Sequence, residues 1–143
     1  MKIAIVGSRK YKNLNIVKSF VENLIGYKDL IIISGGADGV DKTAEEVSME
    51  NQIKTIIYRI ASWYKNGKYN PSAGFERNTT IVENSEIVFC FWDGTSNGCL
   101  DTIKKAKNLN KSYFILDEEG NLIKKTVFDP NHEKFYNEIT NVQ

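Results

Sequence analysis

Short apolar runs alternate along most of the chain with stretches of helical periodicity, and this alternation limits the possible folds more than any other feature. The runs cover residues 3–6, 30–33, 55–58, 87–91 and 113–116, and they are continuous, which is typical of strands buried on both faces. The helical stripes between them are Leu14, Val17, Val21, Leu24 and Ile25, then Val40, Ala44 and Val47, then Phe75, Thr79 and Val82, and finally Cys99, Ile103 and Ala106. Strands alternating with helices in this way predict an α/β fold with a mainly parallel sheet.

The end of the chain departs from this pattern. A polar turn at residues 117–121 predicts a hairpin that leads into an antiparallel edge strand and then a terminal helix. The residues behind this interpretation are Leu122 and Ile123 in the strand, Asp129 and Pro130 at the helix start, and Phe135, Ile139 and Val142 in its apolar stripe. We therefore predict a Rossmann-like three-layer sandwich over residues 1–116. Residues 117–143 are expected to add a C-terminal strand and helix packed on the same domain.

Charge and hydropathy limit the partners. The 143 residues include 19 Lys and Arg against 18 Asp and Glu, so a formal charge of +1 makes nucleic acid an unlikely partner and requires any anion site to be local. The apolar start of the chain is too short for a signal peptide or a membrane span, so we expect a cytoplasmic protein without membrane contact. The terminal stripe and the exposed sheet edge predict a homo-oligomer, a dimer or larger, unless the helix packs within one chain.

Three of the predicted strands open into glycine-containing loops that precede helices. These loops are residues 7–9, 34–41 and 93–98. In a parallel sheet they lie at one edge, where glycines let a ligand approach the backbone and helix N-termini attract phosphate. Neither a Walker A sequence nor a complete G-x-G-x-x-G is present, which disfavours P-loop NTPases and ordinary dinucleotide dehydrogenases. The alternative, that the glycines only make tight turns, stays open for each loop.

Several side chains near these loops suit a phosphate ligand. Arg9 is a natural bidentate partner, and the hydroxyls of Ser8 and Ser34 are possible donors. Asp38 and Asp41 bracket a helix start, where capping is the first interpretation and a ribose contact the second. At the start of a later helix, Glu76 and Arg77 lie beside the same sheet edge, and Arg77 is expected to reach a bound anion unless it is a surface charge.

The stretch of residues 59–74 is longer than a usual strand-to-helix connection, so we expect a functional or mobile loop. Its Trp63, Tyr64 and Tyr69, with Trp92 elsewhere, suit stacking on a base or closing over it, although core packing is equally open for Trp92. No stripe of Lys and Arg interleaved with aromatic residues stands out. Cys99 near a helix N-terminus favours either a lowered thiol pKa or simple packing. The two cysteines predict neither a disulfide nor a metal site, and we expect no cofactor.

The residues at these loops resemble a known family. Gly7-Ser8-Arg9, the 34–41 loop, the segment from Ala61 to Lys68, Arg77-Asn78 and the 93–98 loop occur in the order found in the YspA-type branch of the SLOG superfamily. The resemblance covers roughly residues 1–116. It implies a Rossmann-like fold that binds nucleotides or nucleotide-derived signals, often as an oligomer. Relatives include the LOG phosphoribohydrolases, which cleave the glycosidic bond of nucleoside monophosphates, and the DNA-processing DprA proteins.

The resemblance to the LOG branch is incomplete. Glu76-Arg77 matches the step that carries its catalytic arginine, but Thr102 stands where that branch has a catalytic glutamate, with Asp101 one residue earlier. Threonine cannot stabilise an oxocarbenium-like centre as a carboxylate does. The resemblance therefore implies binding rather than hydrolysis. Arg77, Glu76 and Asp101 are the catalytic candidates if the chain is an enzyme.

The sequence thus predicts a protein that senses, carries or sequesters a nucleotide-derived, phosphate-bearing small molecule, such as an ADP-ribose-like signal. A nucleoside-monophosphate N-glycosidase is the alternative, and binding of single-stranded DNA is a third with less support. The candidate ligand-binding residues are Gly7, Ser8, Arg9, Ser34, Gly35, Gly36, Asp38, Gly39, Trp63, Arg77, Asn78, Asp93, Gly94, Thr95, Asn97 and Gly98.

Overall fold

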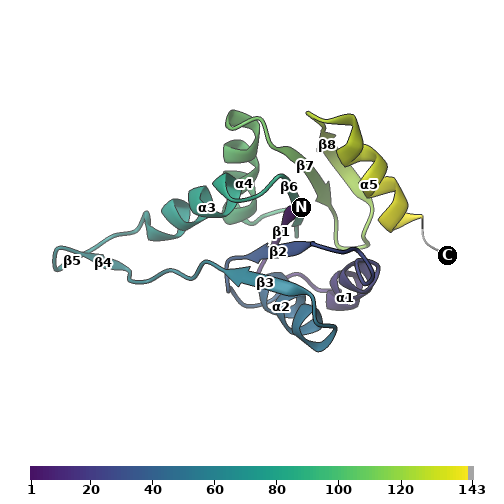
Figure 1. Ribbon diagram of the computed structural model, residues 1–143. Coiled ribbons are helices and arrows are strands. Elements are labelled where there is room, and N and C mark those ends of the chain that lie inside the picture. Colours follow the sequence, from purple (N-terminus) through teal and green to yellow (C-terminus); the bar gives the residue numbers. More distant parts are fainter. Residues whose placement is uncertain (142–143) are drawn as a thin grey trace.

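The computed structural model describes residues 1–141, which form a six-stranded sheet of order β3-β2-β1-β6-β7-β8 (Figure 1). The sheet strands are β1 (Lys2–Gly7), β2 (Ile31–Ser34), β3 (Lys54–Ile57), β6 (Ile87–Phe91), β7 (Ser112–Leu116) and β8 (Leu122–Thr126). The helices are α1 (Leu14–Glu22), α2 (Val40–Glu50), α3 (Ala73–Glu83), α4 (Asn97–Asn108) and α5 (Pro130–Thr140). All neighbouring strands are parallel except β7 and β8. The predicted α/β fold with a mainly parallel sheet is confirmed.

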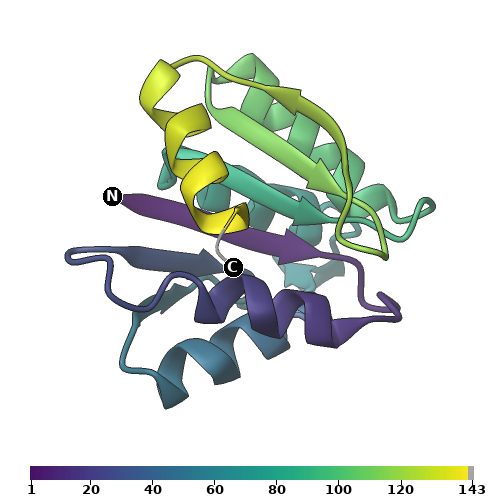
Figure 2. The same ribbon diagram turned by 90° about the vertical axis from the view of Figure 1, so that its right-hand side faces the viewer.

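Two apolar layers lie on opposite faces of the sheet. Along β1, Ile3 and Ile5 pack with α1, α2 and α5, whereas Ala4 and Val6 point to the other face and pack with α3 and α4. Figure 2 shows α5 and α1 in front of the sheet and α4 behind it. This is the predicted three-layer sandwich, which follows from the two-residue period of a strand buried on both faces. Within the described residues, no helix combines the length and apolar character needed to cross a membrane.

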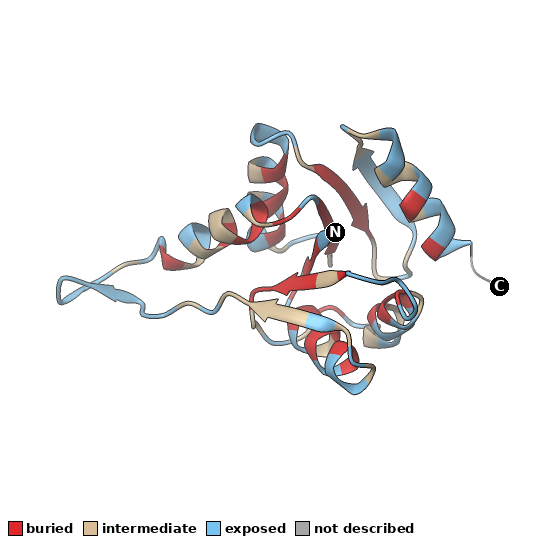
Figure 3. Ribbon diagram, in the orientation of Figure 1, coloured by how far each residue is buried: buried red, intermediate tan, exposed pale blue. Residues whose placement is uncertain are grey.

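Two of the predicted apolar patterns are wrong in detail. The run at residues 55–58 is not buried on both faces, because β3 is the edge strand and its residues range from half-buried to exposed (Figure 3). The predicted stripe of α3 is also shifted. Phe75 is 45% exposed, while Asn78 and Ile81 are buried against the neighbouring elements. The polar Asn78 occupies a buried place that a hydropathy pattern assigns to an apolar residue.

The C-terminal residues form the expected hairpin and helix. β8 pairs with β7 in the antiparallel sense, and the side chain of Asp129 accepts a hydrogen bond from the backbone N–H of Asn131 at the start of α5. Phe135 and Ile139 are buried in the same apolar layer as α1, so the terminal stripe is covered within one chain. These two residues therefore need no partner chain to cover them. Val142, the third residue of the stripe, lies outside the described residues.

Residues 59–72 form an arm that projects away from the sheet (Figure 1). The tip is a two-stranded hairpin of β4 (Tyr64–Lys65) and β5 (Lys68–Tyr69), which the sequence analysis treated as a loop. Asn66 and Gly67 at the turn both have positive φ, of 53° and 77°, as a tight two-residue hairpin turn requires. The Asn-Gly pair was the sequence signal for this hairpin. Tyr64 and Tyr69 face each other across it, with ring centroids 6.0 Å apart.

Candidate functional site

A cavity of about 420 Å³ opens at the carboxyl ends of β1 and β6. From β1 the chain builds the sheet outwards through β2 and β3, and then returns to β6 on the other side of β1. The order therefore reverses between β1 and β6, and the crevice at such a reversal is where open α/β sheets bind ligands. Val6 and Gly7 of β1, together with Cys99 and Thr102 of α4, contribute to the cavity wall.

The first two glycine loops pack closely against each other. A Cβ on Gly7 would lie 2.5 Å from the carbonyl oxygen of Phe91 and 2.7 Å from Cβ of Val40, so glycine lets β1, β6 and α2 approach closely. Gly39 has φ +80°, and a Cβ there would lie 2.5 Å from the carbonyl oxygen of Arg9. Gly7 borders the cavity but Gly39 does not. Part of the glycine pattern therefore serves packing and tight turns rather than approach of a ligand.

The side chain of Asp41 links these two loops by hydrogen bonds. Its Oδ1 accepts the backbone N–H of Gly7 at 3.2 Å, and its Oδ2 accepts that of Ala37 at 3.3 Å. The predicted role in capping is wrong, since α2 begins after Gly39 and has no side-chain cap. Asp41 is only 3% exposed and borders the cavity. Burial raises the pKa of Asp41 to about 7, although the two N–H donors and the nearby Arg77 act in the opposite direction.

Two guanidinium groups meet at the same end of the cavity. Arg77 donates from Nη1 to the carbonyl oxygen of Gly35 and from Nε to Oδ1 of Asn78 at 3.1 Å. A Cβ on Gly35 would lie 2.8 Å from both Arg77 Nη1 and Asp41 Oδ2, so any larger residue there would have to displace these two side chains. Burial lowers the pKa of Arg77, Asp41 raises it, and Arg9 lowers it again, which means that the two arginines repel each other. An anion between them relieves that repulsion.

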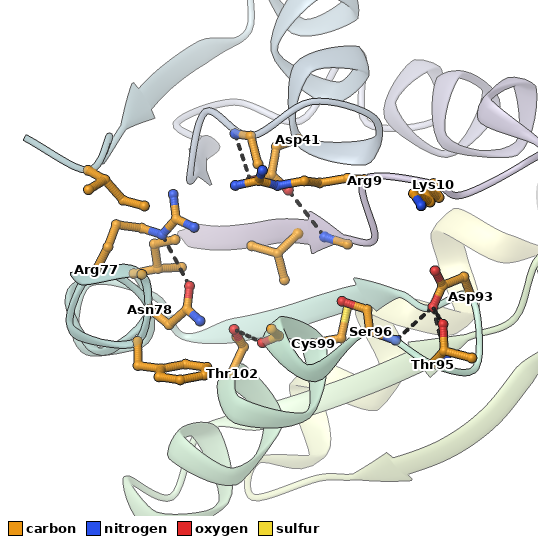
Figure 4. A pocket seen from close by; sticks show the side chains of 18 of the residues that line it. Arg9, Lys10, Asp41, Arg77, Asn78, Asp93, Thr95, Ser96, Cys99 and Thr102 are labelled. Carbon is orange, nitrogen blue, oxygen red and sulfur yellow. Dashed lines mark hydrogen bonds between the residues drawn. The ribbon is translucent and has the colours of Figure 1, made fainter. Parts of the chain in front are cut away.

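Arg9 and Lys10 are the exposed cations of the site (Figure 4). Neither forms an ion pair with a carboxylate among residues 1–141. Asp41 is the buried carboxylate of the cavity wall, and its raised pKa leaves part of its charge neutralised near pH 7. Three cationic side chains thus stand against two carboxylates, Asp41 and Asp93, so the charged groups of the wall have a positive sum despite the near-neutral chain.

Asn78 orients Arg77 from α3. The amide is 6% exposed, accepts from Arg77 through Oδ1, and donates from Nδ2 to Oδ2 of Asp101 at 3.2 Å. Asp101 in turn pairs with Lys105 at 2.6 Å and does not border the cavity. The series of contacts from Arg77 to Lys105 therefore fixes the guanidinium. The side-chain amide of Asn78 accepts from Arg77 through its oxygen and donates to Asp101 through its nitrogen.

The third glycine loop presents the N-terminus of α4 to the cavity. Asp93 Oδ1 accepts the N–H groups of Thr95 and Ser96, both at 2.9 Å. Partial burial acts to raise the pKa of Asp93, but these bonds lower it overall. Ser96 precedes α4 without a side-chain cap, and Gly98 has no close neighbour, so the first N–H groups of the helix are open to a ligand.

The cavity also has apolar lining from the base of the arm and from α3, the helix that carries Arg77. This lining consists of Ile60, Trp63, Pro71 and Phe75. Trp63 is 39% exposed and stacks on Tyr69, with centroids 6.3 Å apart. Tyr64 and Tyr69 do not border the cavity, and neither does Trp92, which donates from Nε1 to the carbonyl oxygen of Ser96. Of the four aromatic candidates, only Trp63 is available to a ligand in this cavity.

The structure brings half of the predicted ligand-binding residues to the cavity wall. Those that border it are Gly7, Arg9, Trp63, Arg77, Asn78, Asp93, Thr95 and Gly98. Those that do not are Ser8, Ser34, Gly35, Gly36, Asp38, Gly39, Gly94 and Asn97. Of the three catalytic candidates, Arg77 borders the cavity, whereas Glu76 and Asp101 do not.

The excluded residues have other partners. Ser34 is completely buried and donates to Oε2 of Glu45 at 2.6 Å, so its hydroxyl faces α2. Ser8 is 1% exposed and accepts the backbone N–H of Asp93 at 3.0 Å, which joins the first loop to the third. Gly36 has φ +72°, and a Cβ there would lie 2.7 Å from Nη1 of Arg59. The positive φ is by itself enough to account for glycine at this position.

Sequence reasoning did not assign several residues of the wall to a ligand site. These are Val6, Lys10, Ala37, Ile60, Pro71, Gly74, Phe75, Ile81, Ser96 and Thr102. Thr102, at the position of the LOG glutamate, donates from Oγ1 to the carbonyl oxygen of Gly98 at 3.0 Å. Cys99 borders the cavity, and its pKa is lowered first by a hydrogen bond from the Cys90 thiol, against the effect of burial. Among residues 1–141, no cluster of three or more metal-ligating side chains occurs.

A mainly parallel sheet with a cavity at the reversal of strand order defines a Rossmann-like α/β domain. Comparison with known proteins is more specific. A family model described as DNA recombination-mediator protein A matches residues 1–62, which is less than half of the chain. No curated protein sequence is significantly similar to the chain.

Three solved structures share the fold. DNA processing protein A (DprA) from Streptococcus pneumoniae is 23% identical with a TM-score of 0.62, and the match covers 80% of this chain and 50% of that one. The Helicobacter pylori DprA, whose structure concerns single-stranded DNA binding, is 19% identical with a TM-score of 0.66 and coverages of 99% and 77%. The molybdenum cofactor carrier protein MCP from Chlamydomonas reinhardtii is 17% identical with a TM-score of 0.62 and coverages of 98% and 85%.

These proteins have SLOG-type folds, and with the family-model match they agree with the predicted resemblance to the SLOG superfamily. At identities under 25%, the solved structures establish the fold alone. This chain spans half the length of the pneumococcal DprA. The YspA-type branch stays a prediction.

Proposed function

We propose that the cavity binds a nucleotide-derived, phosphate-bearing small molecule, which the protein senses, carries or sequesters. The observation that carries this proposal is the convergence of Arg9, Arg77 and the open N-terminus of α4 on one cavity. Guanidinium groups and free backbone N–H groups are the usual partners of phosphate oxygens. The cavity volume of about 420 Å³ lies in the range of small-molecule sites.

The apolar lining of the cavity supports the nucleotide part of the proposal. Trp63, Ile60 and Phe75 offer apolar and aromatic surface, and every base has a face that can stack on an indole ring. A molecule that combines an anionic group with an aromatic ring matches this combination of cationic and apolar side chains. ADP-ribose-like molecules and mononucleotides both have this character.

The wall favours binding over hydrolysis. Cleavage of a glycosidic bond needs a carboxylate at the anomeric carbon, and Thr102 occupies the position of the LOG glutamate. The two carboxylates that border the cavity, Asp41 and Asp93, each already accept two backbone N–H groups. Asp101 lies outside the cavity, where it pairs with Lys105 and accepts a hydrogen bond from Asn78. Glu76 accepts a hydrogen bond at 3.4 Å from the side-chain amide of Asn70. We expect AMP to be released unchanged, with free base appearing slowly or not at all.

Isothermal titration of the full chain with AMP, a cyclic mononucleotide and ADP-ribose tests the proposal. We expect binding of at least one of them. Arg9→Gln should weaken it by about tenfold or more, because a charge-assisted hydrogen bond to phosphate contributes about 1.5 to 3 kcal/mol. Lys124→Gln, on the exposed strand β8, is the matched control. Absence of binding by all three ligands at millimolar concentration would refute the proposal, and rapid release of base would favour the N-glycosidase.

Single-stranded DNA is a second candidate, because the arm carries a feature that sequence analysis missed. Tyr64 and Tyr69 are 66% and 62% exposed on the hairpin, beside Lys65 and Lys68. Exposed aromatic rings interleaved with cations suit stacking and backbone contacts to a single strand. The DprA structure from Helicobacter pylori is described in terms of this ligand.

Fluorescence anisotropy with a labelled oligonucleotide at 50 and 200 mM salt separates the two candidates. A DNA-binding arm predicts salt-dependent binding that the double substitution of Tyr64 and Tyr69 by alanine weakens by about tenfold or more, given about 1 to 3 kcal/mol for each stacked base. An affinity for the oligonucleotide that changes neither with salt nor with substitution of the two tyrosines would exclude this role of the arm.

A further inference from the structure

Asp41 brings a buried acceptor to the cavity wall, in which Asp93 is the other carboxylate. The carboxylate is 3% exposed and belongs to α2, where it borders the cavity beside the glycine loops (Figure 4). Each oxygen accepts one backbone N–H, at 3.2 and 3.3 Å, which are long for a charge-assisted bond. A carboxylate oxygen can accept two hydrogen bonds, so each oxygen of Asp41 keeps acceptor capacity that these two N–H groups do not use.

The surroundings of Asp41 decide which group of a ligand can use that capacity. A phosphate is repelled by the carboxylate and belongs with Arg9 and the N-terminus of α4. A hydrogen-bond donor is attracted, because each further donor stabilises the ionised form of a buried carboxylate and so lowers the pKa of Asp41 from its raised value of about 7. The cavity therefore suits a ligand that presents donors next to its phosphate.

We infer that the ligand of this cavity is a ribonucleotide whose vicinal 2′- and 3′-hydroxyls donate to Asp41. Two adjacent hydroxyls match the two carboxylate oxygens. The amino group of a base is the other source of donors in a nucleotide. The apolar side chains that suit a base, such as Trp63 and Phe75, come from the arm and α3, whereas Asp41 comes from α2 and adjoins the glycine loops. The inference rests on the proposed function and specifies its substrate class.

Titration of the unmodified full chain with AMP, 2′-deoxy-AMP, 3′-deoxy-AMP and IMP tests the inference. We expect each deoxy form to bind about tenfold or more weakly than AMP, because the buried acceptor loses its donor. IMP, which lacks the amino group of adenine, should bind like AMP. The comparison uses the native protein, so it does not depend on the folding of a variant.

Two variants then test whether Asp41 causes the difference in affinity between AMP and the deoxy forms. In Asp41→Asn, the ratio of AMP to deoxy-AMP affinity should shrink towards one, since the neutral amide accepts more weakly and through one oxygen only. Glu46→Gln, an exposed position of the same helix, should keep the native ratio.

The possible failures are distinguishable. Equal binding of AMP and both deoxy forms would overturn the ribose contact and leave the proposed function standing. A loss of affinity with IMP and none with the deoxy forms would move the donor to the base and also overturn the inference. No binding of any of the four compounds or of ADP-ribose would overturn the proposed function together with this inference.

Discussion

At Asp41, burial and hydrogen bonding act on the pKa in opposite directions, and burial dominates, raising the pKa to about 7 from an ordinary value of 3.8. Between these two values, the folded protein holds a proton that the unfolded chain has lost, so stability from this group is lost as pH rises towards 7. From pH 5 to pH 8, the unfolding free energy of the native chain relative to Asp41→Asn should fall by about 3 kcal/mol, since one pKa unit is worth about 1.4 kcal/mol.

Urea denaturation of both proteins at the two pH values measures this difference. Comparison with Asp41→Asn cancels the titration of other groups, and Glu46→Gln should show no such trend relative to the native chain because its side chain is exposed. A difference between native and Asp41→Asn that does not change with pH would mean that the carboxylate is hydrated in solution.

At the scale of the element, the arm of residues 59–72 contributes to the cavity through Trp63 but little to the core. Trp63→Ala should weaken nucleotide binding by about tenfold, because a stacked base is worth about 1 to 3 kcal/mol, while the unfolding free energy changes little. Calorimetric titration and urea denaturation give the two values. Tyr64→Ala is the control within the arm, since Tyr64 is exposed and does not border the cavity. If both variants bound nucleotide like the native chain, Trp63 would have no part in the site.

For the whole molecule, α5 is an integral part of the core, because Phe135 and Ile139 complete the apolar layer that covers one face of the sheet. Ile139→Ala should lower the unfolding free energy by about 2 to 5 kcal/mol, as for other large-to-small changes in a core. The mass of the native state by light scattering should not change. Ile123→Ala, at an exposed position of β8, should stay within about 0.5 kcal/mol of the native value.

An altered mass of the Ile139→Ala variant would show that α5 takes part in an interface after all. Homo-oligomerisation itself stays a prediction, and it no longer has support from the terminal helix. The burial of Phe135 and Ile139 removes the exposed apolar stripe on which that support depended.

Most of the architecture follows from the sequence, because it depends on local periodicity. Continuous β-branched runs form strands buried on both faces, and stripes such as Val40, Ala44 and Val47 form the helix faces that cover them. The placing of glycines directly after strands also put the cavity at the right edge of the sheet, since carboxyl ends of parallel strands share that edge. Gly7, Arg9 and Gly98 reach the cavity for this reason.

The tertiary structure alone decided which of the neighbouring polar residues meet a ligand. Asp38 and Asp41 are equivalent by sequence pattern, yet only Asp41 turns towards Gly7 and the cavity. Ser34 is directed to Glu45, and Asn78 joins Arg77 to Asp101 across α3 and α4. These contacts join residues far apart in the chain or depend on the packing of whole elements. Local propensity therefore determined the layers of this protein, while long-range hydrogen bonds and burial determined its site.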